Sequence, residues 1–188
     1  MRLLGKVLIF VSFLLLSFGS FLSWERTNPN RIQFDTSKVP LKTSTKRDRL
    51  IPVRLTINSA KIDLPIYSAK IHHGQWEDTK DGVSYLDITP APGEKGNSVL
   101  YGHNWPNLLG NLSNVKTGQE IQITLSDGSV RTFIVEFISV VNPDSTYILY
   151  PTSDNRITLY TCTGFLDSKR LVVTASLKAP QLSKGKSI

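Results

Sequence analysis

The chemistry open to this chain depends on its single cysteine, Cys162, which ends the run 157–162. One cysteine cannot form an intramolecular disulfide, so the thiol is either an inert buried group or a reactive nucleophile. Free cysteines are among the most buried residue types, which favours the inert interpretation. The alternation of the predicted strand opposes it, because with Ile157 and Leu159 facing the core, Cys162 points to the other face.

Two further side chains could take part in chemistry at such a thiol. Arg170 begins the predicted strand 170–177, and its guanidinium could hold a substrate backbone or an oxyanion. If this strand pairs with the cysteine strand, Arg170 lies beside the thiol. His103 follows the predicted strand 98–101 and Gly102, a place that suits a site on a barrel rim. Each of the two residues alone is also compatible with an ordinary structural or surface role.

The elements that must position these side chains are short β-branched runs separated by turn signals. Strands are expected at 52–57, 61–66, 98–101, 120–125, 129–140, 157–162 and 170–177, with a short helix or turn at 107–115. Residues 70–97 are expected to be loop-rich and residues 142–156 to form a polar loop, and Pro65 suggests a sheet edge or a strand end. About eight short strands with little helix indicate an all-β fold, a closed or nearly closed eight-stranded β-barrel.

The N-terminus carries a targeting signal. Arg2 and Lys6 precede the uncharged stretch 7–24, which is long enough to cross a bilayer, and Trp24 fits an interfacial anchor. A cleaved signal peptide is the alternative, because residues 17–19 have the small-x-small form of a cleavage site. A lipoprotein is excluded, since no cysteine lies near this segment. The predicted organisation is a transmembrane anchor at 1–24, an extracytoplasmic linker at 25–50, a barrel domain at 51–178 and a polar tail at 179–188.

Composition and charge limit the classes of partner that this chain is expected to bind. The 188 residues suit one domain, and the net charge is +7 with a pI near 9.6. The basic residues are scattered except for the cluster 46–49, and no nucleic-acid motif accompanies it, so no nucleic-acid partner is expected. His72 and His73 are expected at the surface, and no cofactor is expected. The acidic residues Glu77, Asp78 and Asp81 could contribute to a calcium site, or they could form a solvated loop.

Taken together, the three candidate site residues match a known pattern. The run Thr158-Leu159-Tyr160-Thr161-Cys162 resembles the Thr-Leu-x-Thr-Cys signature of sortases, and Arg170 follows on the next strand as in that family. The run from Gly96-Asn97 to Gly102-His103 resembles the context of the family's histidine. The resemblance covers about residues 52–177. The segment 104–107 departs from the pattern after the histidine, so the subfamily and the substrate stay open.

The resemblance implies a thiol transpeptidase at the cell membrane with an extracytoplasmic catalytic domain. Cys162 would attack a sorting signal of the Leu-Pro-x-Thr-Gly type in secreted proteins, and a thioester acyl-enzyme would form. An amine, from a peptidoglycan precursor or a pilin lysine, would then release the product. His103 would act as acid and base, Arg170 would stabilise the oxyanion or align the substrate, and Thr161 would help to position the substrate.

Two alternatives stay beside this hypothesis. An inactive barrel of the same kind could serve as a binding or assembly module, although Cys162, His103 and Arg170 are all present. An L,D-transpeptidase of the cell wall also uses cysteine and histidine. Its Ser-x-Gly-Cys context is absent here, because Thr161 and Thr163 flank the cysteine.

Overall fold

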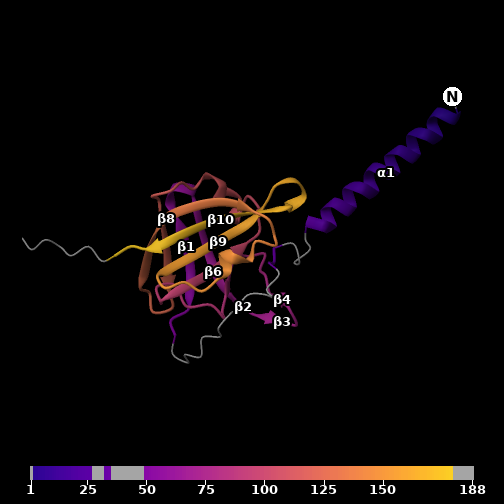
Figure 1. Ribbon diagram of the computed structural model, residues 1–188. Coiled ribbons are helices and arrows are strands. Elements are labelled where there is room, and N and C mark those ends of the chain that lie inside the picture. The colour runs from indigo at the N-terminus through magenta and orange to yellow at the C-terminus, as the bar shows by residue number, and fades with distance from the viewer. Residues whose placement is uncertain (1, 27–31, 35–48, 180–188) are drawn as a thin grey trace, which may run out of the picture.

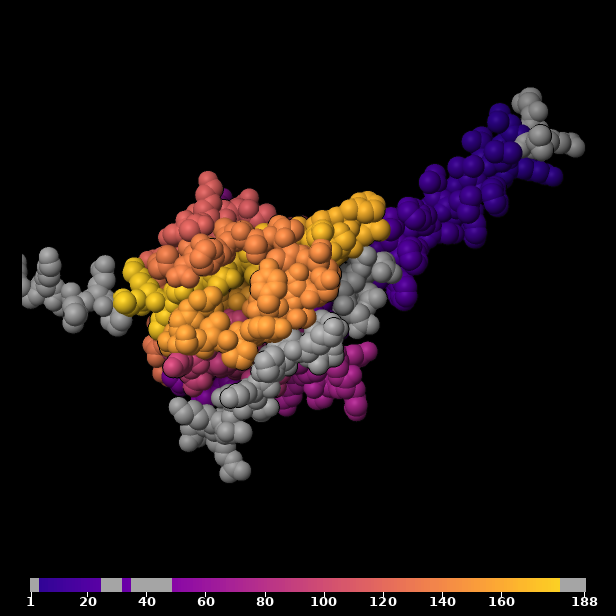
Figure 2. All heavy atoms as spheres, viewed as in Figure 1, coloured from indigo at the N-terminus to yellow at the C-terminus, as the bar shows by residue number. Residues whose placement is uncertain are grey.

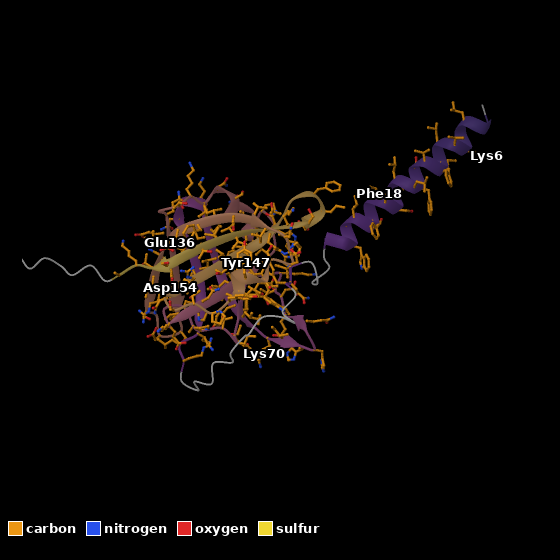
Figure 3. The ribbon with its side chains drawn as sticks, viewed as in Figure 1. Lys6, Phe18, Lys70, Glu136, Tyr147 and Asp154 are labelled. Atoms are coloured by element: carbon orange, nitrogen blue, oxygen red, sulfur yellow. The ribbon has the colours of Figure 1, made fainter. Side chains whose placement is uncertain are left out.

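A barrel and an N-terminal helix make up this computed structural model, which describes residues 2–26, 32–34 and 49–179 (Figure 1). Helix α1 (Arg2–Arg26) extends away from the barrel, and its side chains from Phe18 to Lys6 stand clear of it (Figure 3). The apolar stretch Leu4–Trp24 has 21 residues and a mean hydropathy of 2.1, and it is not buried against the rest of the described structure. This length and composition fit a membrane anchor or a signal sequence.

Eight strands form the closed barrel, in the order β1-β2-β5-β6-β9-β10-β8-β7. The neighbours β2 and β5, and β6 and β9, are parallel, and the remaining pairs are antiparallel. The predicted all-β barrel is therefore confirmed. The barrel strands are β1 (Pro52–Ile57), β2 (Ile62–Ala69), β5 (Val83–Leu86), β6 (Gly96–Gly102), β7 (Glu120–Leu125), β8 (Val130–Val141), β9 (Asn155–Thr163) and β10 (Lys169–Leu177).

Short elements fill the connections between these strands. A two-stranded hairpin, β3 (Ile71–His72) with β4 (Gln75–Trp76), precedes β5. The 3₁₀ helices of the described barrel region are η3 (Asn58–Ala60), η4 (Leu109–Asn114), η5 (Thr146–Leu149) and η6 (Phe165–Asp167). The helix or turn expected at 107–115 is η4.

Two details differ from the sequence prediction. The barrel strand β5 lies inside the region expected to be loop-rich, and both of its faces are buried, so it lacks the alternation that marks a half-buried strand. Pro65 lies inside β2 and not at its end. It is the last residue of β2 that pairs with β1, and Ile66 is the first that pairs with β5. A residue without an N–H is tolerated where the strand changes partner.

Buried apolar side chains fall into two clusters. The inner cluster fills the barrel, and every barrel strand contributes to it. The outer cluster lies on the other face of β6, β9 and β10, because adjacent residues such as Leu159 and Tyr160 belong to different clusters. The outer cluster consists of Ile32, Phe34, Ala69, Trp76, Leu86, Val99, Tyr101, Val141, Leu149, Tyr160, Cys162 and Val172.

Parts of the segment predicted as a linker pack on the barrel. Ile32 and Phe34 are 1% and 3% exposed and complete the outer cluster. Arg49 donates to the carbonyls of Asp87 (2.9 Å) and Thr89 (2.6 Å), which attaches the chain to the barrel before β1 begins. The rest of the predicted linker and basic cluster, and the tail from residue 180, lie outside the described residues, so the predicted domain boundaries stay predictions.

Candidate active site

The ends of three adjacent barrel strands meet at the predicted site. In the antiparallel pair β9·β10, Cys162 is the direct partner of Arg170. In the parallel pair β6·β9, Gly102 is the partner of Thr161, so His103 leaves β6 next to Cys162. The sequence expectation that the arginine strand pairs with the cysteine strand is confirmed. Strand register thus brings the β9 end next to the β6 end, with Thr161 and Gly102 in contact although they are 59 positions apart in the chain.

Cys162 lies in the outer cluster and is 5% exposed. The prediction that it points away from Ile157 and Leu159 is correct, because those two side chains face the barrel interior. This outer face of β9 is also buried, since a second layer covers it. The Phe34 ring packs edge-on against the Tyr160 ring, with 4.9 Å between centroids.

Arg170 is buried at the strand end and is 3% exposed, so it is not a surface arginine. Its Nη1 donates to the carbonyls of Asp167 and Lys169, each at 2.9 Å. Its Nη2 donates to the carbonyl of Gln33 at 3.4 Å, and its Cζ lies 5.9 Å from the Phe34 ring centroid. The guanidinium is therefore fixed from one side by the loop before β10 and contacts residues 33–34 on the other.

His103 is 6% exposed and is held by two contacts that the sequence analysis did not assign. Its Nε2 lies 2.8 Å from Oδ2 of Asp78, and its ring stacks on Trp105 with 4.5 Å between centroids and 12° between planes. From the sequence, Asp78 is expected only as a possible calcium ligand or as part of a solvated loop. Trp105 lies in the segment that departs from the family pattern.

The remaining residues of the two motifs hold the strands in register. The Thr158 hydroxyl donates to Oδ1 of Asn97 at 2.8 Å, and Asn97 Nδ2 donates to the Ile148 carbonyl at 2.8 Å. The Thr161 hydroxyl donates to the Gly102 carbonyl at 2.7 Å. This contact anchors the residue that precedes His103, and Thr161 lies on the opposite face of β9 from Cys162. The role of Thr161 in substrate positioning stays a prediction.

Gly96, which opens the histidine motif, has a structural reason to be glycine. Its φ of +123° is one that other residues rarely adopt, and a Cβ would lie 2.7 Å from Cγ of Pro90.

Two tyrosines of the outer cluster stay neutral beneath the site. Burial raises the pKa of Tyr160 well above its ordinary value. Burial, followed by the charge of Asp78, raises the pKa of Tyr101 in the same direction. The two rings stack with 5.6 Å between centroids. The floor of the site is therefore apolar and carries no phenolate charge at ordinary pH.

The acidic and histidine residues near β3 and β4 make other contacts. Glu77 accepts from the Lys70 N–H at 2.9 Å, and its Oε1 lies 3.1 Å from Nε2 of His72, which is exposed as predicted. Asp78 is engaged with His103. Among the described residues, no three or more His, Cys, Asp or Glu side chains group as a metal site would require.

Comparisons with known proteins agree with this geometry. Residues 55–178 match the Sortase domain family. Sortase A from Corynebacterium diphtheriae superimposes with a TM-score of 0.60 at 26% identity, over 88% of this chain and 86% of that chain. Sortase C-1 from Actinomyces oris gives 0.58 at 26% identity, over 85% and 98%.

A third structure shares the fold. It is Clostridium perfringens sortase C with the C-terminal cell wall sorting motif, which gives a TM-score of 0.58 at 24% identity over 73% of this chain and 78% of that chain. A sequence comparison with curated proteins finds no match. The family match spans well over half of the chain and includes all three strand ends of the site. By sequence profile and by fold, this chain belongs to the sortase family of transpeptidases.

Proposed function

We propose that this chain is a membrane-anchored cysteine transpeptidase that cleaves a C-terminal sorting signal and joins the released protein to an amine at the cell envelope. The observation that carries the proposal is the pairing of Cys162 with Arg170 at adjacent strand ends, with His103 leaving the neighbouring strand. A thiol, a fixed guanidinium and an imidazole at one barrel rim are the groups that acyl transfer needs.

In the first half of the reaction, the Cys162 thiolate attacks the scissile carbonyl and an Sγ–C bond forms. The tetrahedral intermediate collapses to a thioester when the C–N bond breaks, and protonated His103 gives its proton to the leaving amine. Arg170 would stabilise the developing oxyanion, and the carbonyls of Asp167 and Lys169, which accept from its Nη1, hold the guanidinium in place.

In the second half, an amine attacks the thioester carbonyl and gives a proton to neutral His103. The C–S bond then breaks, a new amide forms and the thiolate is regenerated. Splitting one difficult exchange into two steps is what a covalent nucleophile contributes.

The substrate class is carried over from a relative as part of the proposal. The C. perfringens sortase C was solved with its C-terminal cell wall sorting motif. For this chain we propose sorting signals of the Leu-Pro-x-Thr-Gly type and an acceptor amine on a peptidoglycan precursor or a pilin lysine. The apolar helix Leu4–Trp24 would anchor the enzyme with its catalytic domain outside the cytoplasm.

Turnover requires residues 32–34 to leave the site. Ile32 and Phe34 belong to the same buried cluster as Cys162, and the Gln33 carbonyl accepts a hydrogen bond from Arg170. A peptide carbonyl cannot approach the thiol and the guanidinium while this segment is seated. The low exposure of Cys162 is therefore compatible with a reactive thiol whose cover can move.

Three variants of the full chain in detergent test the proposal with a sorting-signal peptide and an added amine. Cys162→Ala should reduce cleavage to background, and wild type trapped with peptide should gain the mass of the acyl group. Arg170→Lys keeps the charge but loses the planar donor fork, so kcat should fall about 10²- to 10³-fold. Ser139→Ala, an exposed position on β8, is the matched control. Cleavage by Cys162→Ala at the wild-type rate would refute the assignment.

A further inference from the structure

The loop between β9 and β10 presents two apolar side chains to solvent. Phe165 is 85% exposed and Leu166 is 46% exposed. Among the described residues, no other large apolar side chain is as exposed as Phe165, and this includes those of α1. Leu166 and Asp167 have φ of +50° and +58°, a backbone conformation that gives this tip a defined shape.

This loop lies beside the outer end of the apolar helix. Gly19 and Leu22 of α1 line one cleft together with Gly164, Leu166 and Asn104. The loop also lies next to the end of α1 in the ribbon and space-filling views (Figures 1 and 2). Since a helix rises about 1.5 Å per residue, Gly19 lies only about 7.5 Å below Trp24 along the axis. The loop is therefore level with the last turns of the apolar stretch.

Chain length limits how far the barrel can lie from the end of the apolar stretch. Ile32 is buried in the outer cluster and follows Trp24 by eight residues. At about 3.6 Å per extended residue, the barrel rim lies at most about 29 Å from the end of the apolar stretch while Ile32 is seated. The basic surface of the chain, with net charge +7, also suits an anionic lipid surface.

We propose that the outer leaflet of the bilayer is the partner of this loop, with Phe165 and Leu166 inserted at the headgroup boundary. Aromatic and aliphatic side chains next to a membrane span are stabilised in that layer. Asn104 lines the same cleft and directly follows His103, so insertion turns the mouth of the site toward the membrane surface. The site would then meet a sorting signal that is still held close to the bilayer. This inference rests on the anchoring proposed above but not on catalysis.

Depth-dependent fluorescence quenching tests the insertion. Full-length Phe165→Trp is reconstituted in vesicles of phosphatidylcholine and phosphatidylglycerol, with or without lipids brominated near the headgroup end of the acyl chain. Subtraction of wild type removes the signal of the native tryptophans. We expect the added emission to be quenched by about half or more.

Phe137→Trp is the matched control, because Phe137 is also an exposed phenylalanine, at 65%, but lies in β8. We expect less than a tenth of its added emission to be quenched. Equal quenching of the two variants would overturn the proposal. Blue-shifted Phe165→Trp emission without lipid quenching would also overturn it, since it would assign the loop to a protein surface. Loss of peptide cleavage with normal quenching would count against the proposed function alone.

A second inference concerns Asp78 and is independent of the membrane. The carboxylate is the acceptor in its contact with His103, so Nε2 of the imidazole carries the hydrogen. In the neutral ring, Nδ1 is then the nitrogen that can take up a proton. The stacked Trp105 ring limits rotation of the imidazole plane.

We propose that Asp78 is a positioning residue that fixes the Nε2–H tautomer of His103 and leaves Nδ1 as the working nitrogen. Asp78 comes from the loop between β4 and β5, 25 residues before His103, and its side chain is 21% exposed. The contact is therefore partly shielded from water. This inference deepens the proposed function. Its expected effect on kcat rests on that function, whereas the tautomer of His103 does not.

The test compares Asp78→Asn with Glu77→Gln, the neighbouring carboxylate that contacts His72 and not His103. In Asp78→Asn we expect kcat to fall about 10- to 100-fold with KM changed less than threefold, within the range of general acid–base catalysis. Asp78→Glu should recover part of the loss, and Glu77→Gln should match wild type.

A spectroscopic readout separates positioning from a purely structural role. Imidazole ¹⁵N shifts of His103 should report the Nε2–H tautomer in wild type and in the Cys162→Ala protein, and a tautomer mixture in Asp78→Asn. Unchanged shifts, or a kcat within twofold of Glu77→Gln, would overturn the role of Asp78. The shifts in Cys162→Ala do not require turnover, so failure of the proposed function leaves this measurement valid.

Discussion

The inner and outer clusters of the barrel differ in the parts of the chain that close them. The inner cluster is lined by the strands themselves, together with Leu109 and Leu112 of η4, so it is closed whenever the barrel is closed. The outer cluster is covered by pieces from elsewhere, among them Ile32 and Phe34 from the N-terminal segment and Leu149 from η5. Cys162 belongs to the second kind of cluster.

The inner cluster governs the stability of the barrel, whereas the outer cluster governs access to Cys162. Side chains in the inner cluster cannot be exposed without opening strand pairs, which is global unfolding. Side chains in the outer cluster can be exposed when a short attached segment lifts off. The proposed nucleophile, Cys162, therefore lies in the cluster that can be exposed while the barrel stays closed.

The largest expected effect comes from Phe133→Ala in the inner cluster. Phe133 is fully buried, and removing a buried phenylalanine costs about 3–5 kcal/mol of the free energy of unfolding. Urea unfolding of wild type and variant measures the loss. If the free energy of unfolding of Phe133→Ala lies within about 1 kcal/mol of the wild-type value, the inner cluster is not the main source of stability.

A phenylalanine-to-alanine substitution in the outer cluster, Phe34→Ala, should instead change the access of reagents to Cys162. Phe34 is 3% exposed and packs on Tyr160, and burial of a phenylalanine contributes about 1.5–3 kcal/mol. In Phe34→Ala we expect the segment to open more often, so that iodoacetamide labels Cys162 about 10-fold faster or more, since about 1.4 kcal/mol corresponds to a factor of ten.

The barrel of Phe34→Ala should unfold at nearly the wild-type urea concentration. Faster labelling together with a large loss of barrel stability would show that residues 32–34 are part of the folded core. Phe133→Ala serves as the control for labelling through global unfolding.

A smaller effect is expected at Tyr160, the floor of the outer cluster. Its hydroxyl has no hydrogen-bond partner among the described residues, and a buried unsatisfied hydroxyl costs free energy. Tyr160→Phe should raise the free energy of unfolding by about 1 kcal/mol, which thermal unfolding can detect. A lower melting temperature would indicate that the hydroxyl is bonded in the native protein, and the apolar description of the floor would then be wrong.

The smallest effect concerns a pair outside both clusters. Asp154 precedes β9 at the end of the barrel away from α1 (Figure 3), and Arg156 Nε donates to its Oδ1 at 2.9 Å. The hydrogen bond from Arg156 lowers the pKa of Asp154 to about 2. A lowered pKa stabilises the fold above the ordinary value of about 3.9, and this contribution is lost as pH falls toward 2.

The Asp154 side chain is 40% exposed, so solvent screening limits the pair to less than about 1 kcal/mol. Urea unfolding of wild type and Asp154→Asn should differ slightly at pH 6, and the difference should shrink as the pH is lowered from about 4 toward 2. A difference that stays constant with pH would exclude the ionised pair as its cause.

Most of the barrel could be predicted from the sequence because its strands leave local marks. The alternation of Ile121, Ile123 and Leu125 and the turn after it identify β7 and the start of β8. β5 could not be found this way, because both of its faces are buried and no alternation remains. β2 continues past Pro65 because it changes its partner there from β1 to β5, and no sequence pattern predicts such a change.

The site was predictable as far as its residue types and motifs, but not in its surroundings. Cys162, His103 and Arg170 occur in distinctive runs, and the strand pairing of Cys162 with Arg170 follows from short-range order along the chain. Asp78 carries no local signal for its contact with His103, because the two residues are 25 positions apart and Asp78 lies in the irregular loop between β4 and β5. The same holds for Phe34, which reaches Tyr160 across more than a hundred residues.

The sequence by itself determined the class of fold, the apolar N-terminal segment and the candidate site residues, because strand alternation, apolar length and sequence motifs are properties of neighbouring residues. Only the tertiary structure decided that Cys162 is covered, that Asp78 holds His103 and that the loop with Phe165 lies level with the end of α1. These relations arise from the closure of the barrel, which sets distances between residues that are remote in the chain.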